Sequence, residues 1–422
     1  MKAQQNPNHH SVMLIAFHYP PIQMSSGVHR AVAFSRYLAE HNWDVDVLTV
    51  TASTYEQTNN LAAELLPAKV RLIRCKAWDT ARDLALKGRY FSWMAQPDRW
   101  LSWLPTAVLK GWWKLKPNQL ILSTYPIATA HIIGYLLHKL SGNRWIVDLR
   151  DPMLQQDYPS DPTRRKIFQW IEQKIVRHAS FVMLTSPGAI ELYQQRYPDK
   201  AADFWRLFPN GYDEKVFAGL TTAPSPPEPR RYTLLHSGTI YPQERDPTAF
   251  FTALQQLKQQ DPTLPSRLQV VLRASGHDAL LRQLIAHYQL ADLVELKPAI
   301  DYRAAAQEIL NADALLLLQA ASCNYQTPAK AYEYIRARRP VLVLAPAQSD
   351  TSQLMLQSRV ACQADLADAA QIAAAITEML QRLQQQQFDF LDETQIQRFS
   401  RTATAALLAE HLQAIHQKDQ SS

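Results

Sequence analysis

The strongest constraint on the fold of this 422-residue chain is the alternation of short apolar runs with longer amphipathic segments. Runs of this length indicate strands, and segments with helical spacing separate most of them. Strands that alternate with helices build parallel sheets. The expected strands are Val12–Phe17, Val45–Thr49, Val70–Ile73, Leu120–Ser123, Trp145–Asp148, Phe181–Thr185 and Arg206–Phe208, then Thr233–Ser237, Leu268–Leu272, Leu293–Leu296, Ala314–Leu318, Val341–Ala345 and Val360–Cys362. The sequence therefore predicts an α/β protein with two parallel-sheet domains.

A proline-rich segment divides the two halves. Residues 218–231 contain Pro224, Pro226, Pro227 and Pro229 without a periodic apolar pattern, which is typical of an extended linker. We therefore expect domains at 1–217 and 232–390. A last helix, roughly Thr394–Gln417 within residues 391–422, carries apolar residues that leave its packing partner open, including a return to the first domain.

Composition and charge exclude several classes of protein. The chain is 47% hydrophobic and 19% charged, which is typical of a globular protein. Its net charge of +6 is small for this length, so we expect no nucleic-acid partner. Three distant cysteines indicate a reducing compartment. Without a signal-peptide pattern or an apolar run near ~18 residues, we expect a cytoplasmic protein.

Common catalytic motifs are missing from the sequence. There is no GxxxxGK[ST] or GxGxxG loop, no HExxH helix and no GxSxG turn, which disfavours P-loop nucleotidases, classical dehydrogenases, zinc peptidases and serine hydrolases. Asp44-Val45-Asp46 matches the DxD pattern of some metal-dependent sugar-nucleotide enzymes. However, the run from Trp43 to Thr49 alternates like a strand, so we expect no metal there.

The segment from Gln326 to Tyr334 is the most informative one for function. Thr327 is a good N-cap and Pro328 suits the first helical position. The amino end of this helix would attract an anion, and Lys330 adds a positive charge suited to a phosphate. Glu333, on the same side, could accept hydrogen bonds from ribose hydroxyls. The alternative is a solvated ion pair between Lys330 and Glu333.

A second polar cluster follows the Thr233–Ser237 run. Gly238 would let the backbone approach a ligand closely, and the Arg245 guanidinium could bind a phosphate. An ordinary turn with a surface arginine is the alternative. Together with the helix at Lys330, this cluster makes a diphosphate site plausible.

Several motifs, in order along nearly the whole chain, resemble those of family 4 glycosyltransferases. They are His18-Tyr19-Pro20-Pro21, Ser26-Gly27-Val28, Pro209-Asn210-Gly211-Tyr212-Asp213, Ser237-Gly238-Thr239-Ile240-Tyr241 and Pro328 to Pro340. The resemblance implies the GT-B fold, in which two Rossmann-like domains face a central cleft. It also implies transfer of a sugar from a nucleotide donor with retention, with no metal and no other cofactor.

The resemblance also implies roles for individual residues. Glu333 would bind the donor's ribose, and Lys330 would lie near the diphosphate with the helix amino end. Arg245 stands where the family often has a lysine that neutralises the leaving diphosphate. The candidate catalytic residues are Arg245, Lys330, Glu333 and His131, and the candidate donor-binding residues are Ser26, Gly27, Gly238, Thr239, Ala299, Ile300, Thr327, Lys330 and Glu333.

The sequence departs from the family pattern at two positions. Tyr325 stands where the family commonly has a second glutamate, eight positions before Glu333. The usual histidine after the fourth strand is absent from Ser123-Thr124-Tyr125-Pro126, and His131 is the nearest candidate, with a plain helix-surface histidine as the alternative. Asp151 or Arg150 could contact the acceptor, or cap the next segment and pair with each other.

Aromatic and basic residues are mixed in one stretch of the first half. Residues 82–116 hold five tryptophans and seven lysines and arginines, against only Asp83 and Asp98. Such a mixture favours peripheral contact with an anionic membrane, although tryptophans in a core and solvated lysines would also explain it.

The resemblance and the sequence together predict a retaining glycosyltransferase that acts on a saccharide or lipid-linked saccharide acceptor. We expect it to serve cell-surface polysaccharide synthesis at the cytosolic face of the inner membrane. Two rival hypotheses remain. One is a non-catalytic nucleotide- or glycan-binding partner, and the other is a nucleotide-sugar epimerase of similar shape.

Overall fold

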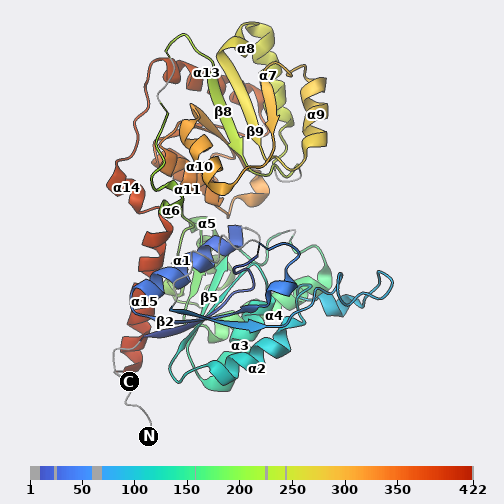
Figure 1. Cartoon of the computed structure of the whole chain (residues 1–422), viewed down its shortest axis with the longest axis vertical. Helices are drawn as coiled ribbons and strands as arrows, with labels where there is room; N and C mark the ends of the chain where they lie inside the picture. Colours follow the sequence, from blue (N-terminus) through green and yellow to red (C-terminus); the bar gives the residue numbers. More distant parts are fainter. Residues whose placement is uncertain are drawn as a thin grey trace. The chain divides into compact units, whose positions relative to one another are not determined.

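The structure is a computed structural model that describes residues 10–22, 26–58, 69–156, 158–223, 227–242 and 245–420. The chain divides into two compact units, one of residues 1–209 with 401–422 and the other of residues 210–400. Both are built from parallel strands and helices (Figure 1). Within the described ranges no helix has the length and hydropathy that crossing a membrane requires.

The first unit holds a parallel sheet in the order β3-β2-β1-β4-β5-β6-β7. Its strands are β1 (Ser11–Ile15), β2 (Asp44–Val50), β3 (Val70–Cys75), β4 (Leu120–Thr124), β5 (Trp145–Arg150), β6 (Val182–Leu184) and β7 (Trp205–Leu207). Its helices are α1 (Ser26–Glu40), α2 (Trp103–Lys114), α3 (Thr129–Ser141), α4 (Pro162–His178), α5 (Pro187–Arg196) and α15 (Arg401–Gln420).

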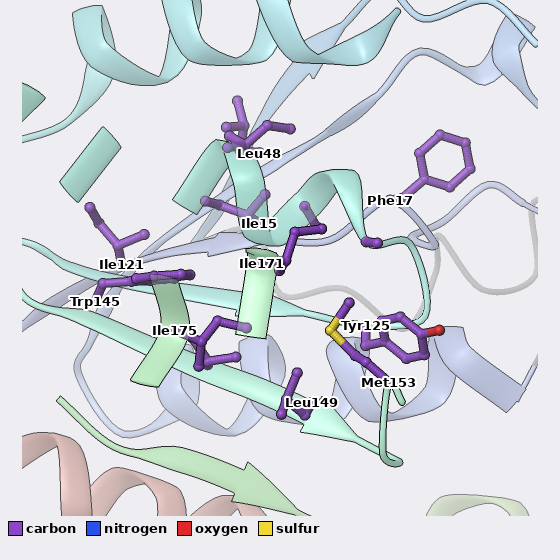
Figure 2. Close-up of a cluster of buried hydrophobic side chains, with 14 of the residues drawn as sticks. Ile15, Phe17, Leu48, Ile121, Tyr125, Trp145, Leu149, Met153, Ile171 and Ile175 are labelled. Carbon is purple, nitrogen blue, oxygen red and sulfur yellow. The ribbon is translucent and has the colours of Figure 1, made fainter. Parts of the chain in front are cut away.

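Apolar residues cover both faces of this sheet because successive strand side chains point to opposite sides. Ile15 packs with α2, α3, α4 and α5 on one face, where Trp145 and Ile171 lie in the same cluster (Figure 2). Leu14 packs on the other face with α1 and α15. The last helix thus belongs to the first unit, with Leu408 and Leu412 fully buried.

The second unit repeats this arrangement around a sheet in the order β10-β9-β8-β11-β12-β13. Its strands are β8 (Tyr232–Ser237), β9 (Leu268–Arg273), β10 (Val294–Lys297), β11 (Ala314–Leu318), β12 (Val341–Leu344) and β13 (Ala361–Ala364). Its helices are α6 (Glu214–Phe217), α7 (Thr248–Gln260), α8 (Leu264–Arg267), α9 (Asp278–His287), α10 (Tyr302–Asn311), α11 (Ala329–Ala337), α12 (Asp350–Gln357), α13 (Ala369–Gln384) and α14 (Glu393–Gln397).

Two boundaries differ from the sequence-based expectation. The units divide after Pro209 rather than at residue 217, because Tyr212 and Phe217 are buried in the second unit's core. The expected final helix is two helices, α14 and α15, separated by residues 398–400. Of the expected linker at 218–231, Pro224 and Pro226 lie outside the described residues.

The order of strands places a switch point at the same position in each sheet. β1 and β4 are neighbours in the first unit, and β8 and β11 in the second, although neither pair is consecutive in the chain. Open α/β sheets bind ligands at the carboxyl ends of the strands beside such a point. The loops that follow β8 and β11 are therefore where a ligand site is expected in the second unit.

Candidate functional site

Lys330 and His236 meet beside the switch point of the second unit. His236, near the end of β8, is fully buried, and Lys330 is in the first turn of α11. The His236 Nδ1 lies 2.9 Å from the Leu316 carbonyl oxygen, so Nδ1 carries the proton and donates to that oxygen. Its Nε2 then accepts a hydrogen bond from the Lys330 Nζ at 3.4 Å. This histidine was not among the predicted site residues.

The environment weakens the charge of this lysine when the site is empty. Burial, reinforced by the positive charge of Arg245, lowers the pKa of Lys330 to about 7, while Glu333 acts in the opposite direction. Burial and the charge of Lys330 also hold the pKa of His236 well below its usual range, so the imidazole is neutral. An anion bound here would favour the protonated lysine.

Gly238 and Thr239 form the wall against which this lysine lies. Gly238 has a φ of +111°, and a Cβ there would lie 3.0 Å from the Lys330 Nζ. Glycine is therefore required both by the backbone conformation and by the close approach of the ammonium group. The Arg245 Nη1 donates to the Thr239 carbonyl oxygen at 3.0 Å, which joins the second cation to the same loop.

Only some of the hydrogen-bond donors of the Arg245 guanidinium have a partner. Its guanidinium carbon lies 5.6 Å from the centre of the Tyr241 ring, and its Nε is buried with no hydrogen-bond partner among the described residues. Buried polar atoms are normally paired, so an unpaired donor here is consistent with a site for an acceptor-rich ligand. Lys330 and Arg245 thus place two cations at one loop, while the diphosphate site expected from the sequence stays a prediction.

The start of α11 differs from the expectation. The helix begins at Ala329 with Pro328 as its N-cap, so the prediction of Thr327 as N-cap and Pro328 as the first helical residue is wrong. Pro328 is in an extended conformation and brings no side-chain capping bond, and Thr327 is buried beneath the helix start. The Ala331 N–H donates to the Pro328 carbonyl oxygen at 3.0 Å, whereas the helix supplies no carbonyl one turn earlier for the N–H groups before it, and these suit an anion.

Polar side chains from elsewhere hold the segment that leads into α11. The Asn210 Nδ2 donates to the Thr327 carbonyl oxygen at 3.2 Å. The buried Gln319, after β11, donates to the carbonyl oxygens of Cys323 and Gln326 and accepts from the Thr351 hydroxyl. These contacts fix where the helix begins. Gln319 and Thr351 were missed because only the fold shows what they contact.

Glu333 lies on α11 one turn beyond Lys330 and is half-buried. Its Oε1 accepts a hydrogen bond from the Tyr302 hydroxyl at 2.5 Å. No ion pair joins Glu333 to Lys330 in the described part of the chain, so the alternative of a solvated pair is wrong. A half-buried carboxylate with acceptor capacity left over suits vicinal hydroxyl groups.

The loop after β10 is also held by a buried cation. Arg273, at the end of β9, forms a two-pronged ion pair with Glu308 and donates to the Pro298 carbonyl oxygen at 2.8 Å. Ala299 and Ile300, two of the residues predicted to bind the donor, follow this anchor and are exposed. Their exposed position fits a contact surface, and Arg273 is the residue that fixes it.

In the first unit the candidate donor residues lie at the start of α1. The side chain of Ser26 lies outside the described residues, while Gly27 is buried. The Gly27 carbonyl oxygen accepts from the Arg150 Nη2 at 2.9 Å. The Asp148 carboxylate, fully buried, accepts two hydrogen bonds from Arg30 at 3.0 Å.

These contacts decide whether Arg150 is free to contact an acceptor. Burial lowers the pKa of Arg150 to about 10, against the charge of Asp148, and its Nε donates to the Thr124 hydroxyl at 3.1 Å. Arg150 is therefore a structural residue that positions the start of α1. Asp151 is half-buried beside Thr185, and burial raises the pKa of its carboxyl group.

The structure corrects the prediction that His131 is a catalytic residue. Its imidazole is fully buried in α3, where Nδ1 shares a 2.8 Å hydrogen bond with the Ser123 hydroxyl. Burial lowers its pKa to about 3, so it stays neutral. A side chain enclosed by the core cannot touch an acceptor, and the alternative of a helix-surface histidine is wrong as well. His131 anchors α3 to β4.

The DxD-like pair also has a structural explanation. Asp44 pairs with Lys116 at 2.6 Å, and Asp46 pairs with Arg71 at 2.6 Å and accepts from Gln119 at 2.8 Å. Both carboxylates lie on β2 and bind side chains from neighbouring segments. Across the described residues, no group of three or more histidine, cysteine, aspartate or glutamate side chains is arranged to hold a metal ion.

A comparison with protein families identifies the first half of the chain. Residues 26–211 match the glycosyl transferase 4-like domain, a range that ends within two residues of the first unit's boundary. This part of the chain is therefore similar to that domain. The resemblance inferred from the motifs is therefore confirmed. No curated protein matches the chain.

Solved structures extend the similarity beyond the transferase domain. Sucrose-phosphate synthase from Thermosynechococcus elongatus is 18% identical, with a TM-score of 0.67, over 98% of this chain and 100% of that one. The Anabaena protein HepE, solved with UDP, is 13% identical, with a TM-score of 0.65, over 96% and 100%. A trehalose-phosphate synthase (UDP-forming) from Burkholderia vietnamiensis is 11% identical, with a TM-score of 0.66, over 98% and 99%.

These similarities show the fold. The two parallel-sheet units have the GT-B architecture of glycosyltransferases, as the resemblance implied. The domain match and the fold together support a glycosyltransferase of the GT-B type. They leave the donor, the acceptor and the residue roles to be proposed from the site.

Proposed function

We propose that this protein is a retaining glycosyltransferase that moves a hexosyl group from a nucleotide-sugar donor to a saccharide acceptor. The observation that carries the proposal is the pair of cations, Lys330 and Arg245, at the Gly238 loop beside the amino end of α11. Two cations and a helix amino end match the charge of a diphosphate. Structures of HepE with UDP and with UDP-glucose favour a uridine diphosphate sugar as the first donor to test.

The chain's own residues would supply the chemistry. Lys330 and Arg245 stabilise the negative charge that develops on the leaving diphosphate, a role that a metal ion plays in other transferases. Glu333 accepts hydrogen bonds from the ribose and fixes the nucleotide. The anomeric carbon is then held for attack by an acceptor hydroxyl, so positioning and charge stabilisation lower the barrier.

The acceptor is the less constrained half of the proposal. We assign it to saccharides that are carried on a lipid for cell-surface polysaccharide synthesis, so that the protein works on the cytosolic face of a membrane. The support is the mixture of exposed aromatic and basic residues in the first unit.

Thermal unfolding with UDP-, GDP-, ADP-, CMP- and dTDP-sugars tests the donor site. The correct donor at about 100 times its Kd should stabilise the folded protein by about 2.7 kcal/mol. Glu333→Ala should lose this shift. Glu378→Ala, which removes an exposed carboxylate of α13 paired with Arg382, should keep it. A shift that survives both Glu333→Ala and Lys330→Met would place the nucleotide elsewhere and overturn the proposal.

A further inference from the structure

Exposed apolar side chains are concentrated in one stretch of the first unit. Of the eighteen large apolar side chains that are exposed among the described residues, nine lie between residues 78 and 113. They are Trp78, Leu84, Leu86, Tyr90, Phe91, Trp93, Leu109, Trp112 and Trp113. Soluble proteins rarely gather such residues without a partner, so this concentration needs an explanation.

Part of this stretch is a projecting turn. Leu86 and Arg89 exchange backbone hydrogen bonds of 2.8 and 3.0 Å around Lys87 and Gly88, both with positive φ. A Cβ on Gly88 would meet no atom within 4 Å, so the tip packs against nothing. Leu86 is 82% exposed and Phe91 71% exposed. Figure 1 shows this light-blue segment extending from the rest of the unit.

The neighbouring helix α2 carries apolar side chains on its exposed face as well as on its buried face. Its inner face packs through Trp103, Ala107 and Gly111, where a Cβ on Gly111 would lie 2.9 Å from Leu137. Its outer face presents Leu109, Trp112 and Trp113 beside the exposed Lys110 and Lys114, and Trp113 is 79% exposed. The Ser102 hydroxyl, just before α2, bonds to both backbone groups of Trp78 and joins the projecting stretch to the helix.

The charges around these side chains are positive. Asp83 pairs with Arg82, and the Asp98 carboxylate accepts from the Thr129 backbone and hydroxyl, so neither acid is free to balance the stretch. Lys87, Arg89 and Lys114 form no ion pair with a described residue. Lys116, by contrast, pairs with Asp44, and Lys110 donates to the Arg74 carbonyl oxygen.

We propose that Leu86, Phe91, Trp93, Trp112 and Trp113, with Lys87, Arg89 and Lys114, form an interfacial surface that binds the headgroup region of an anionic lipid bilayer. The inference rests on the proposed function only for the acceptor that such a bilayer would carry. Aromatic rings occupy the boundary between headgroups and acyl chains, while lysine and arginine contact the lipid phosphates. A second copy of the chain is a poorer occupant, because a two-fold interface would place these unpaired cations against each other.

Co-sedimentation with vesicles tests this surface. The full chain should bind vesicles of phosphatidylglycerol and phosphatidylethanolamine and bind pure phosphatidylcholine far less. Lys87→Glu/Arg89→Glu/Lys114→Glu should weaken binding to the anionic vesicles by more than about tenfold. Phe91→Ser/Trp93→Ser and Trp112→Ser/Trp113→Ser should each weaken it through lost interfacial burial. Lys166→Glu and Leu356→Ser, exposed positions outside the surface, are the controls and should bind as the wild type does.

The unfolding temperature and the response to donor distinguish a failure of this surface from a failure of the proposed function. Every variant should retain its unfolding temperature and its stabilisation by the donor, because the surface lies outside the Lys330 site. Vesicle binding that survives both the charge and the tryptophan variants overturns the inference and leaves the proposed function intact. Vesicle binding without any response to nucleotide sugars supports the inference while the proposed function fails. A wild-type dimer that the triple variant dissolves, with no vesicle binding, assigns the surface to a second copy and also overturns it.

Discussion

At Lys330 the fold keeps a titratable amine half-buried between the neutral His236 and the Gly238 backbone. The folded-state pKa of about 7 lies below the ordinary lysine value of 10.5 because burial and Arg245 disfavour the charge. A bound diphosphate requires that charge. The charged form of Lys330 is therefore favoured by a bound diphosphate and disfavoured in the empty protein. Two predictions depend on this difference.

The first is the pH dependence of donor binding. Because the ligand binds the protonated amine, the Kd for a nucleotide sugar should rise by about tenfold between pH 7 and pH 8.5, where the lysine of the empty site loses its proton. Isothermal titration measures this directly. Lys330→Met should bind weakly at every pH with no such slope. A wild-type Kd that stays constant across this range would contradict the assigned role of Lys330.

The second is the stability of the empty protein. A lysine whose folded pKa lies below its unfolded pKa destabilises the fold, fully below pH 7 and not at all above pH 10.5. Lys330→Met should therefore raise the unliganded melting temperature at pH 6 by roughly 2–4 °C, the shift that about 1 kcal/mol gives in a domain of ~150–250 residues. At pH 10.5 the gain should vanish. A melting temperature lowered at pH 6 would show that Lys330 stabilises the fold instead.

At the scale of elements, α15 is the segment that joins the two ends of the sequence into one unit. It packs beside α1 against the first sheet, where Ala405, Leu408 and Leu412 are buried. Leu408→Ala should lower the free energy of unfolding by about 2–5 kcal/mol, because it leaves a cavity in this layer. Leu407→Ala, at a half-buried position, should cost less in the same urea titration. Equal losses would mean that the helix is not docked by its buried face.

The elements themselves could largely be predicted from periodicity. Every expected strand corresponds to one of β1–β13, because a buried parallel strand is a short apolar run. The ends of the last helix could not be predicted from periodicity. At the break, residues 398–400, the Tyr212 N–H donates to the Phe399 carbonyl oxygen, and such a distant partner leaves no local pattern.

The candidate site was predictable to a similar degree. Lys330, Arg245 and Gly238 stand out in the sequence because cations and glycine in loops after strands are local signals. His236, Arg273 and Gln319 act through partners far along the chain, so only the fold shows their roles. His131 was misassigned because its place in the helix follows from sequence, whereas its burial depends on which helix face meets the sheet.

At the scale of the whole molecule, one strand order occurs twice, and each unit gathers polar residues where its strands end beside the switch point. The first unit holds most of the residues that match the glycosyl transferase 4-like domain, and the second holds Lys330, Arg245 and Glu333. A binding protein, an epimerase and a transferase would share this architecture. What separates them is the fate of the donor.

A ³¹P and ¹H NMR time course of the donor, taken with the full chain and water as a slow acceptor, distinguishes these three functions. We expect release of the nucleoside diphosphate and of a sugar that first appears with its anomeric configuration retained. Arg245→Met and Glu333→Ala should slow this release by about 100-fold or more, since charge stabilisation is lost in one and positioning in the other. A donor that binds but stays intact would instead indicate a binding protein, and its conversion into a different nucleotide sugar would indicate an epimerase; either result excludes the transferase.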